Sequence, residues 1–143
     1  MNNVMEEKII FTTGGTGGHI YPALAIAKEF KKRGSSILFV GTKHRMEREI
    51  VPNEGYDFIG LDVLPLRSIK SFIKMLKAIK EALRIVKNEK PTKVIGFGNY
   101  ISIPILVAAK IKKIPYYLQE QNSTIGMANR YFYKGSQKTF LAF

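Results

Sequence analysis

The chain has 143 residues, of which 45% are hydrophobic and 11% aromatic, so it is long enough to bury one sizeable core. It contains no cysteine, which excludes disulfides and thiolate chemistry in this sequence. Its 23 lysines and arginines against 11 aspartates and glutamates give a formal net charge of +12, which indicates an anionic partner: nucleic acid, acidic lipid or a phosphorylated substrate. The N-terminus lacks the apolar segment of a signal peptide, and no apolar run is long enough to cross a bilayer, so we expect a cytoplasmic protein.

The first predicted unit is a buried strand over 8–13, followed by a glycine-rich loop and a helix over 21–32 with Pro22 in its first turn. The loop reads Gly14-Gly15-Thr16-Gly17-Gly18-His19. Glycines contribute nothing to packing, but they allow close backbone approach and positive φ. A strand, such a loop and a helix N-terminus together favour an anion site, most often for phosphate. A plain glycine-rich turn is the alternative, and the pattern fits neither the dinucleotide-binding nor the nucleoside-triphosphate motif.

The remaining elements alternate in the same way. We expect helices over 45–51, 69–88, 103–112 and 125–134, and strands over 36–40, 57–61, 93–97, 115–120 and 137–143. The longest helix carries apolar residues at helical spacing: Ile69, Phe72, Ile73, Leu76, Ile79, Leu83 and Val86. This order predicts an α/β fold, with a Rossmann-like doubly wound parallel sheet that is covered on both faces.

Three polar segments follow strands of this predicted sheet. They comprise residues 13–19, 98–102 and 119–124. Because ligands of such folds bind outside the carboxyl ends of the strands, we expect the three segments to meet in space and form an active site.

The same segments together resemble the MurG family of bacterial N-acetylglucosaminyltransferases, which convert lipid I to lipid II in peptidoglycan and cell wall synthesis. The resemblance covers nearly all of the chain. It is carried by the first glycine loop with the following Ile20-Tyr21-Pro22-Ala23-Leu24-Ala25, by Arg45-Met46-Glu47 with Val51-Pro52, by Leu66-Arg67, by Gly96-Phe97-Gly98-Asn99-Tyr100-Ile101-Ser102, and by Glu120-Gln121-Asn122 with Gly126 and Asn129. It implies an inverting, metal-independent transfer that needs no cofactor.

Family members are about twice this length and have the two Rossmann-like domains of the GT-B arrangement. The resemblance therefore implies that residues 1–143 form the N-terminal, acceptor-side domain, that the C-terminal UDP-sugar-binding domain is absent from this chain, and that the chain alone is inactive. Asn99 and Ile103 stand where the family usually has glycine, and Gln119 stands where it has histidine. Asn99 can still adopt positive φ.

The resemblance also implies roles for individual residues. The catalytic candidates are His19 and Glu120. The donor-binding candidates are Thr16, Gly17, Gly18 and Asn122, and the acceptor diphosphate is assigned to Gly14, Gly15, Gly98, Asn99, Tyr100 and Ser102. The partners are UDP-GlcNAc and undecaprenyl-linked lipid I.

Each assignment has a structural alternative. His19 is either a general base, in a place where the helix dipole favours its neutral form, or a helix cap or phosphate ligand. Asn122 could cap the next helix, and Glu120 could pair with Arg130 or a lysine. Arg67 is either a diphosphate partner or a solvated side chain, and His44 is expected at the surface.

The start of the longest helix has a further feature. Apolar residues there are followed by many lysines, a pattern suited to an anionic bilayer surface. The predicted membrane-contact residues are Leu64, Leu66, Ile69, Phe72 and Ile73, which would place the protein peripherally on the inner face of the cell membrane. Ordinary packing on the sheet accounts for Leu76, Ile79 and Leu83.

Two other functions are consistent with parts of the sequence. One is a stand-alone acceptor- and membrane-binding subunit that needs a separate donor-site partner. The other is a nucleic-acid-binding module, prompted by the net charge of +12. No aromatic–basic RNA motif or recognition helix supports this module, so we expect no nucleic acid among the partners.

Overall fold

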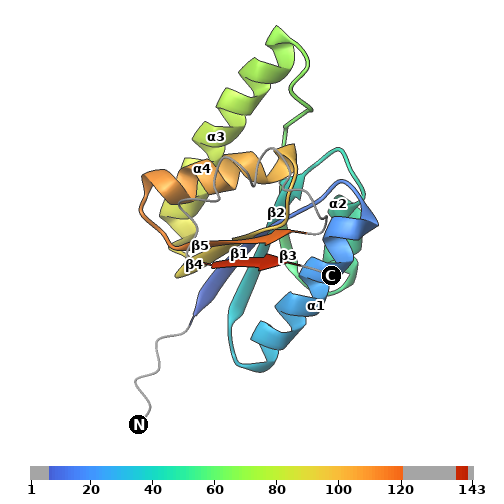
Figure 1. Cartoon of the computed structure of the whole chain (residues 1–143), viewed down its shortest axis with the longest axis vertical. Coiled ribbons are helices and arrows are strands. Elements are labelled where there is room, and N and C mark those ends of the chain that lie inside the picture. Colours follow the sequence, from blue (N-terminus) through green and yellow to red (C-terminus); the bar gives the residue numbers. More distant parts are fainter. Residues whose placement is uncertain (1–6, 121–137, 142–143) are drawn as a thin grey trace.

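The structure, a computed structural model, describes residues 7–120 and 138–141. Figure 1 shows a sheet with helices on both faces, which confirms the predicted α/β class. The strands lie in the order β3-β2-β1-β4-β5-β6, and every neighbouring pair is parallel. Their bounds are β1 Lys8–Thr12, β2 Ser36–Thr42, β3 Asp57–Leu61, β4 Lys93–Gly96, β5 Tyr116–Glu120 and β6 Lys138–Leu141.

Helices α1 and α2 cover one face of the sheet, and α3 and α4 cover the other (Figure 1). The chain steps from β1 to β3 in one direction and from β4 to β6 in the other, so right-handed connections place the two helix pairs on opposite faces. The bounds are α1 Gly17–Lys32, α2 Glu47–Asn53, α3 Ile69–Glu89 and α4 Ile103–Ile111, with the short 3-10 helix η1 at Tyr100–Ser102. The predicted helix over 125–134 lies outside the described residues.

Alternate residues of the central strand serve two separate cores. Phe11 faces α1 and stacks on Phe39 and Phe97, with ring centroids 5.2 and 6.0 Å away. Ile10 faces the other way, into the cluster under α3 and α4. This alternation, with apolar residues on both faces, is the signature of a strand covered on both sides.

Helix α1 begins at Gly17, earlier than the predicted start at residue 21. Pro22, expected in the first turn, therefore lies in the second. Glycine is a poor residue inside a helix, which is why the sequence favours a later start, but the first positions of a helix need no intrahelical donor. As a result, Gly17, Gly18 and His19 form the first turn of α1.

Of the three residues of α3 that are expected to pack on the sheet, one does not. The buried residues of this helix include Met75, Ala78 and Ala82, whereas Leu76 is 52% exposed although it was assigned to packing on the sheet. Ile79 and Leu83 do lie against the core, as expected. Small side chains on the inner face let α3 lie close to α4, and the larger apolar side chains of its first turns are exposed.

Candidate active site

The strand order reverses at β1, which has β2 on one side and β4 on the other. In sheets of this kind the crevice at the reversal point is the usual ligand site. The loop after β1 contains the first glycines, and the loop after β4 contains Gly98 and Asn99. The side-chain amide of Asn99 donates a hydrogen bond to the Gly14 carbonyl at 3.0 Å, so the two loops are in direct contact. The predicted convergence of these two segments is confirmed.

The third predicted segment is described only at its start. Gln119 and Glu120 end β5, the strand next to β4, and Gln119 is buried. Asn122 lies outside the described residues.

The first two glycines of the loop are internal, not ligand-facing. Gly15 has φ +93° and donates its N–H to Glu47 Oε1 at 2.9 Å, while the Gly14 carbonyl accepts from Asn99. Both glycines are buried. The Gly15 N–H is therefore not available to an acceptor diphosphate, which corrects the expected role of this glycine, and the exposed part of the loop begins at Thr16.

The start of α1 is the part of this loop that is open to a ligand. Thr16 occupies the N-cap position, but its side chain makes no capping hydrogen bond. Its hydroxyl lies instead 3.0 Å from His19 Nδ1, and Thr13 donates to the His19 carbonyl at 2.9 Å. Thr16 and Gly18 are exposed and His19 is half-buried. Since the first amides of a helix have no intrahelical acceptor, this end of α1 can bind an anion.

The second loop is held in an unusual backbone conformation. Asn99 has φ 91° and ψ 178°, a region that glycine adopts far more readily than other residues, and its Oδ1 accepts from the Ile101 N–H at 2.8 Å. Asparagine thus reaches the positive φ that the sequence predicts it can adopt here. Tyr100 is half-buried. Ser102 is fully buried and donates to the Thr12 carbonyl at 3.1 Å, so its hydroxyl fastens the loop to β1 and does not face the open side.

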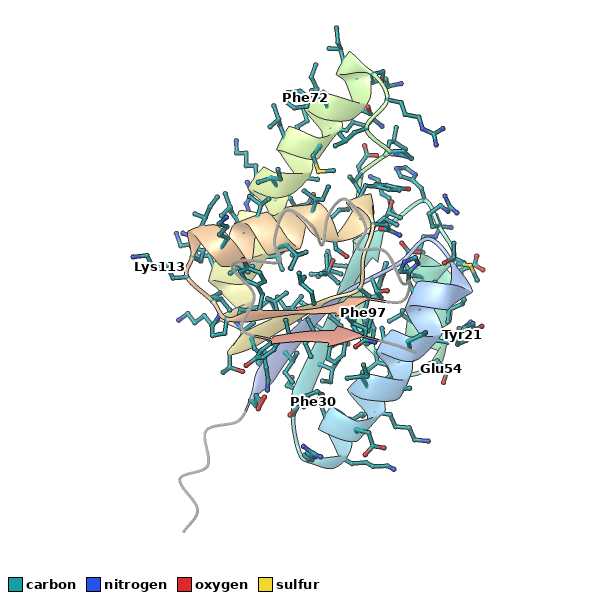
Figure 2. The ribbon with its side chains drawn as sticks, in the orientation of Figure 1. Tyr21, Phe30, Glu54, Phe72, Phe97 and Lys113 are labelled. Carbon is teal, nitrogen blue, oxygen red and sulfur yellow. The ribbon has the colours of Figure 1, made fainter. Side chains whose placement is uncertain are left out.

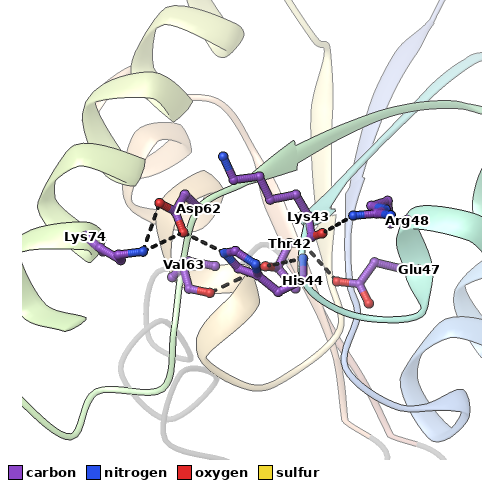
Figure 3. Close-up of polar contacts among 8 residues, drawn as sticks. All are labelled: Thr42, Lys43, His44, Glu47, Arg48, Asp62, Val63 and Lys74. Carbon is purple, nitrogen blue, oxygen red and sulfur yellow. Dashed lines mark hydrogen bonds and ion pairs between the residues drawn. The ribbon is translucent and has the colours of Figure 1, made fainter. Parts of the chain in front are cut away.

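A polar cluster lies at the ends of β2 and β3, where Figure 3 shows His44, Asp62 and Lys74 in contact. His44 is exposed, as expected, and its Nε2 lies 2.6 Å from Asp62 Oδ1. Lys74, from α3, donates to both carboxylate oxygens at 3.2 and 3.1 Å. The hydrogen bond from His44, with Lys74 adding to it, lowers the pKa of Asp62 below its usual value.

Two residues with contacts to the first glycine loop were given no role from the sequence. Glu47 is fully buried and binds the Gly15 and Thr42 amides, and Arg45 donates to the Gly15 carbonyl at 3.0 Å. The available signal was a charged pair spaced two residues apart directly after a buried strand, inside the Arg45-Met46-Glu47 motif. Their partners are backbone groups, which a sequence pattern does not identify.

An exposed apolar surface covers the first turns of α3, and Figure 2 shows Phe72 near the outer end of that helix, away from the sheet. Ile69 is 81% exposed, and the surface also includes Leu66, Phe72, Ile73 and Leu76. Leu64 is half-buried. None of the helices in the described ranges has both the length and the apolarity that crossing a membrane requires.

A hollow of about 340 Å³ lies away from both glycine loops, between α1 and the starts of β4 and β5. It is lined by Ile26, Glu29, Phe30, Arg33, Lys93, Ile95 and Tyr117. These residues lie toward the amino ends of the strands, the wrong edge of the sheet for ligand binding in this fold. The hollow is therefore not part of the candidate site.

Comparisons with known proteins give one consistent result. The model of the glycosyltransferase family 28 N-terminal domain matches residues 9–141. The chain is 52% identical over 137 residues to a Fusobacterium nucleatum protein, and the match covers 96% of this chain and 38% of that protein. The relative is named UDP-N-acetylglucosamine–N-acetylmuramyl-(pentapeptide) pyrophosphoryl-undecaprenol N-acetylglucosamine transferase. A Halothermothrix orenii protein of the same name is 46% identical over 129 residues, covering 86% of this chain and 35% of that one. The chain thus spans well under half the length of these relatives.

The solved structures agree. The crystal structure of Acinetobacter baumannii MurG has a TM-score of 0.89 and 29% identity, covering 96% of this chain and 42% of that one. A UDP-N-acetylglucosamine 2-epimerase has a TM-score of 0.72 at 13% identity, covering 96% of this chain and 42% of that one. At that identity the likeness concerns the fold alone.

Proposed function

The chain belongs to glycosyltransferase family 28, as an N-terminal domain, and from this we propose that it is the acceptor-side domain of a GT-B enzyme. That enzyme transfers GlcNAc from UDP-GlcNAc to lipid I and gives lipid II for the cell wall. The observation that carries the proposal is that the two glycine loops meet at the reversal point of the sheet, beside the open start of α1. The substrate assignment is supported by the 52% identity to the Fusobacterium nucleatum protein, which is named as an N-acetylglucosamine transferase.

In the proposed reaction a hydroxyl of the acceptor sugar attacks the anomeric carbon of GlcNAc. The bond from that carbon to the UDP oxygen breaks, and the hydroxyl proton passes to His19. The Thr16 hydroxyl lies 3.0 Å from His19 Nδ1 and would orient the ring, so that the other ring nitrogen accepts the proton. Glu120 remains the second catalytic candidate.

The departing UDP gains negative charge, and the open start of α1 would stabilise it. Thr16, Gly17 and Gly18 form the uncapped end of this helix, where the backbone amides and the helix dipole favour an anion. We assign these residues, with Asn122, to the donor. Gly98, Asn99 and Tyr100, on the neighbouring loop, are assigned to the diphosphate of the acceptor.

The acceptor is anchored in a membrane, and we propose that the exposed apolar surface on α3 lies on the inner face of the cell membrane. Three observations support this: the apolar residues are exposed, lysines flank them along the same helix, and the chain has a net charge of +12. Apolar side chains would enter the interfacial region while the lysines attract anionic lipids. The flanking lysines are Lys70, Lys77 and Lys80, while Lys74 on the same helix is paired with Asp62.

The direct test uses this chain joined to a UDP-sugar-binding domain, an assembly that is called the whole enzyme below. Incubation with radiolabelled UDP-GlcNAc and a lipid I analogue should give a labelled lipid product together with one UDP per transfer. A folded protein that binds both substrates but only hydrolyses the nucleotide sugar, or leaves it intact, would refute the proposal.

A further inference from the structure

Both backbone polar groups of Gly15 are held by side chains from the segment after β2. Glu47 Oε1 accepts from the Gly15 N–H at 2.9 Å, and Arg45 Nη2 donates to the Gly15 carbonyl at 3.0 Å. Gly15 has φ +93°, and because glycine restricts the backbone less than other residues do, contacts from elsewhere are needed to hold the loop in this conformation. The two bonds fix the direction in which the chain enters Thr16 and α1.

Glu47 is fully buried, which is costly for a carboxyl group unless its oxygens are hydrogen-bonded. Its second oxygen, Oε2, accepts from the Thr42 N–H at 2.8 Å, and Figure 3 shows this contact at the end of β2. One side chain therefore ties the glycine loop to a strand of the sheet.

Two glycines make room for this side chain. A Cβ atom on Gly14 would lie 2.2 Å from Glu47 Oε2, and one on Gly41 would lie 2.8 Å from Glu47 Cγ. Gly14 thus serves the packing of Glu47, in addition to its own positive φ of 155°. Two glycines and one buried carboxylate thus act together to fix the conformation of this loop, which indicates that the conformation is needed for its function.

We propose that Arg45 and Glu47 are positioning residues for the donor: by holding Gly15 they aim the backbone amides of Thr16, Gly17 and Gly18 at the diphosphate of the nucleotide sugar. They act through Gly15 and do not touch the substrate. The identity of the ligand rests on the proposed function, whereas the contacts of Arg45 and Glu47 with Gly15 do not depend on it.

Arg45 and Arg48 provide a matched pair of variants. Both are exposed arginines, and each donates one hydrogen bond to a backbone carbonyl. Arg45 binds Gly15 at 3.0 Å, while Arg48 binds Lys43 at 3.1 Å, outside the glycine loop (Figure 3). Arg45→Met and Arg48→Met therefore remove the same kind of contact from different places. Neither change introduces a cavity, because both arginine side chains are exposed, so both variants should fold.

The first readout is amide hydrogen exchange on this chain, which needs no ligand. The Gly15 amide should exchange at least tenfold faster in Arg45→Met than in Arg48→Met, while the sheet amide of Ile10 stays the same in both. Equal exchange of the Gly15 amide in the two variants would overturn the proposal, because Arg45 would then not hold the loop.

The second readout is kinetic and uses the whole enzyme. Arg45→Met should lower kcat/KM for UDP-GlcNAc at least tenfold and leave KM for the lipid acceptor within twofold, while Arg48→Met changes both less than twofold. Arg45→Lys, which retains a donor, should recover most of the loss. A change confined to the acceptor KM, or equal losses in both variants, would overturn the donor role. If the unchanged enzyme transfers no GlcNAc, the proposed function fails, and the exchange of the Gly15 amide alone decides the positioning role.

Discussion

The side-chain amide of Asn99 donates a hydrogen bond to the carbonyl of Gly14, 3.0 Å away and 85 positions earlier in the sequence. The same side chain accepts from the Ile101 N–H at 2.8 Å. Asn99 thus shapes its own loop and fastens it to the other glycine loop. A glycine at this position would adopt the backbone conformation more easily but would make neither contact.

Replacing Asn99 separates backbone strain from side-chain contacts. Asn99→Gly and Asn99→Ala both lose the two hydrogen bonds, worth about 0.5–1.5 kcal/mol each. Only the alanine variant keeps a side chain at φ 91° and ψ 178°, which costs on the order of 1–3 kcal/mol. We therefore expect Asn99→Ala to unfold about 1–3 kcal/mol more easily than Asn99→Gly in urea.

Lys113 offers the control for this comparison, because it also has positive φ, at 59°, and is exposed at the end of α4. Lys113→Gly should exceed Lys113→Ala in stability by about 1 kcal/mol. Neither should alter the amide resonances of the glycine loops. If the two Asn99 variants were equally stable, strain at Asn99 would be refuted.

Sequence patterns predict most of the fold, since most strands are apolar runs bounded by glycine, proline or charged residues. The strand over 57–61 has the predicted bounds, and the strands predicted over 8–13, 36–40, 93–97 and 115–120 differ by one or two residues at one end. The ends of the strand predicted over 137–143 lie outside the described residues. The periodicity of α3 does not reveal which side faces inward. Both a row of large apolar residues and a row with Ala78 and Ala82 recur at helical spacing, and contact with α4 selects the smaller residues.

The site was predicted only in part, for a similar reason. Glycines and a following helix indicate an anion site from local features alone. The partners of Glu47 are the amides of Gly15 and Thr42, which come together only in the folded sheet. The same holds for Ser102, whose hydroxyl binds the Thr12 carbonyl.

His19 is expected to accept a proton during transfer. In the whole enzyme His19→Ala should lower kcat at least tenfold, the lower end of what a general base contributes. His44→Ala is the control, because His44 is the other histidine of the chain and is bound to Asp62 outside the glycine loops. Near-normal turnover of the His19 variant in a radiolabelled GlcNAc assay would exclude the base role.

The stability of the chain should depend on the ionisation of Asp62. Its pKa is lowered by the hydrogen bond from His44 and, to a smaller extent, by Lys74. A carboxyl group with a lower pKa in the folded state adds stability that is fully present above its unfolded pKa, about 3.9. This stability disappears as the pH falls through the folded value.

Urea unfolding from pH 6 to pH 2 measures this effect. The unchanged chain should exceed Asp62→Asn in stability at pH 6, and the difference should shrink below about pH 4. Because the Asp62 side chain is 39% exposed, we expect the difference to stay below about 1 kcal/mol. A difference that grows as the pH falls would contradict the sign of the pKa shift.

The apolar surface on α3 predicts binding to anionic vesicles. Leu66→Glu combined with Phe72→Glu removes two exposed apolar side chains and adds two negative charges, each worth about 1 kcal/mol at such a surface. Co-sedimentation with phosphatidylglycerol vesicles should weaken at least tenfold. Ile111→Glu is the control, since Ile111 is 57% exposed at the end of α4. Equal binding by the double variant and the unchanged chain would remove the membrane role from this surface.

The central claim is that the two glycine loops form one site for a pyrophosphate-linked sugar. The most direct test is a titration of the isotope-labelled chain with a short-prenyl lipid I analogue, followed through its amide resonances. The account predicts that the amides of Gly98 and Asn99, at the acceptor diphosphate, shift with one shared Kd together with those of Gly17 and Gly18, because Asn99 contacts the loop that leads into these glycines. Inorganic phosphate should compete weakly at the same amides. Shifts confined to one loop, or two unrelated values of Kd, would contradict it.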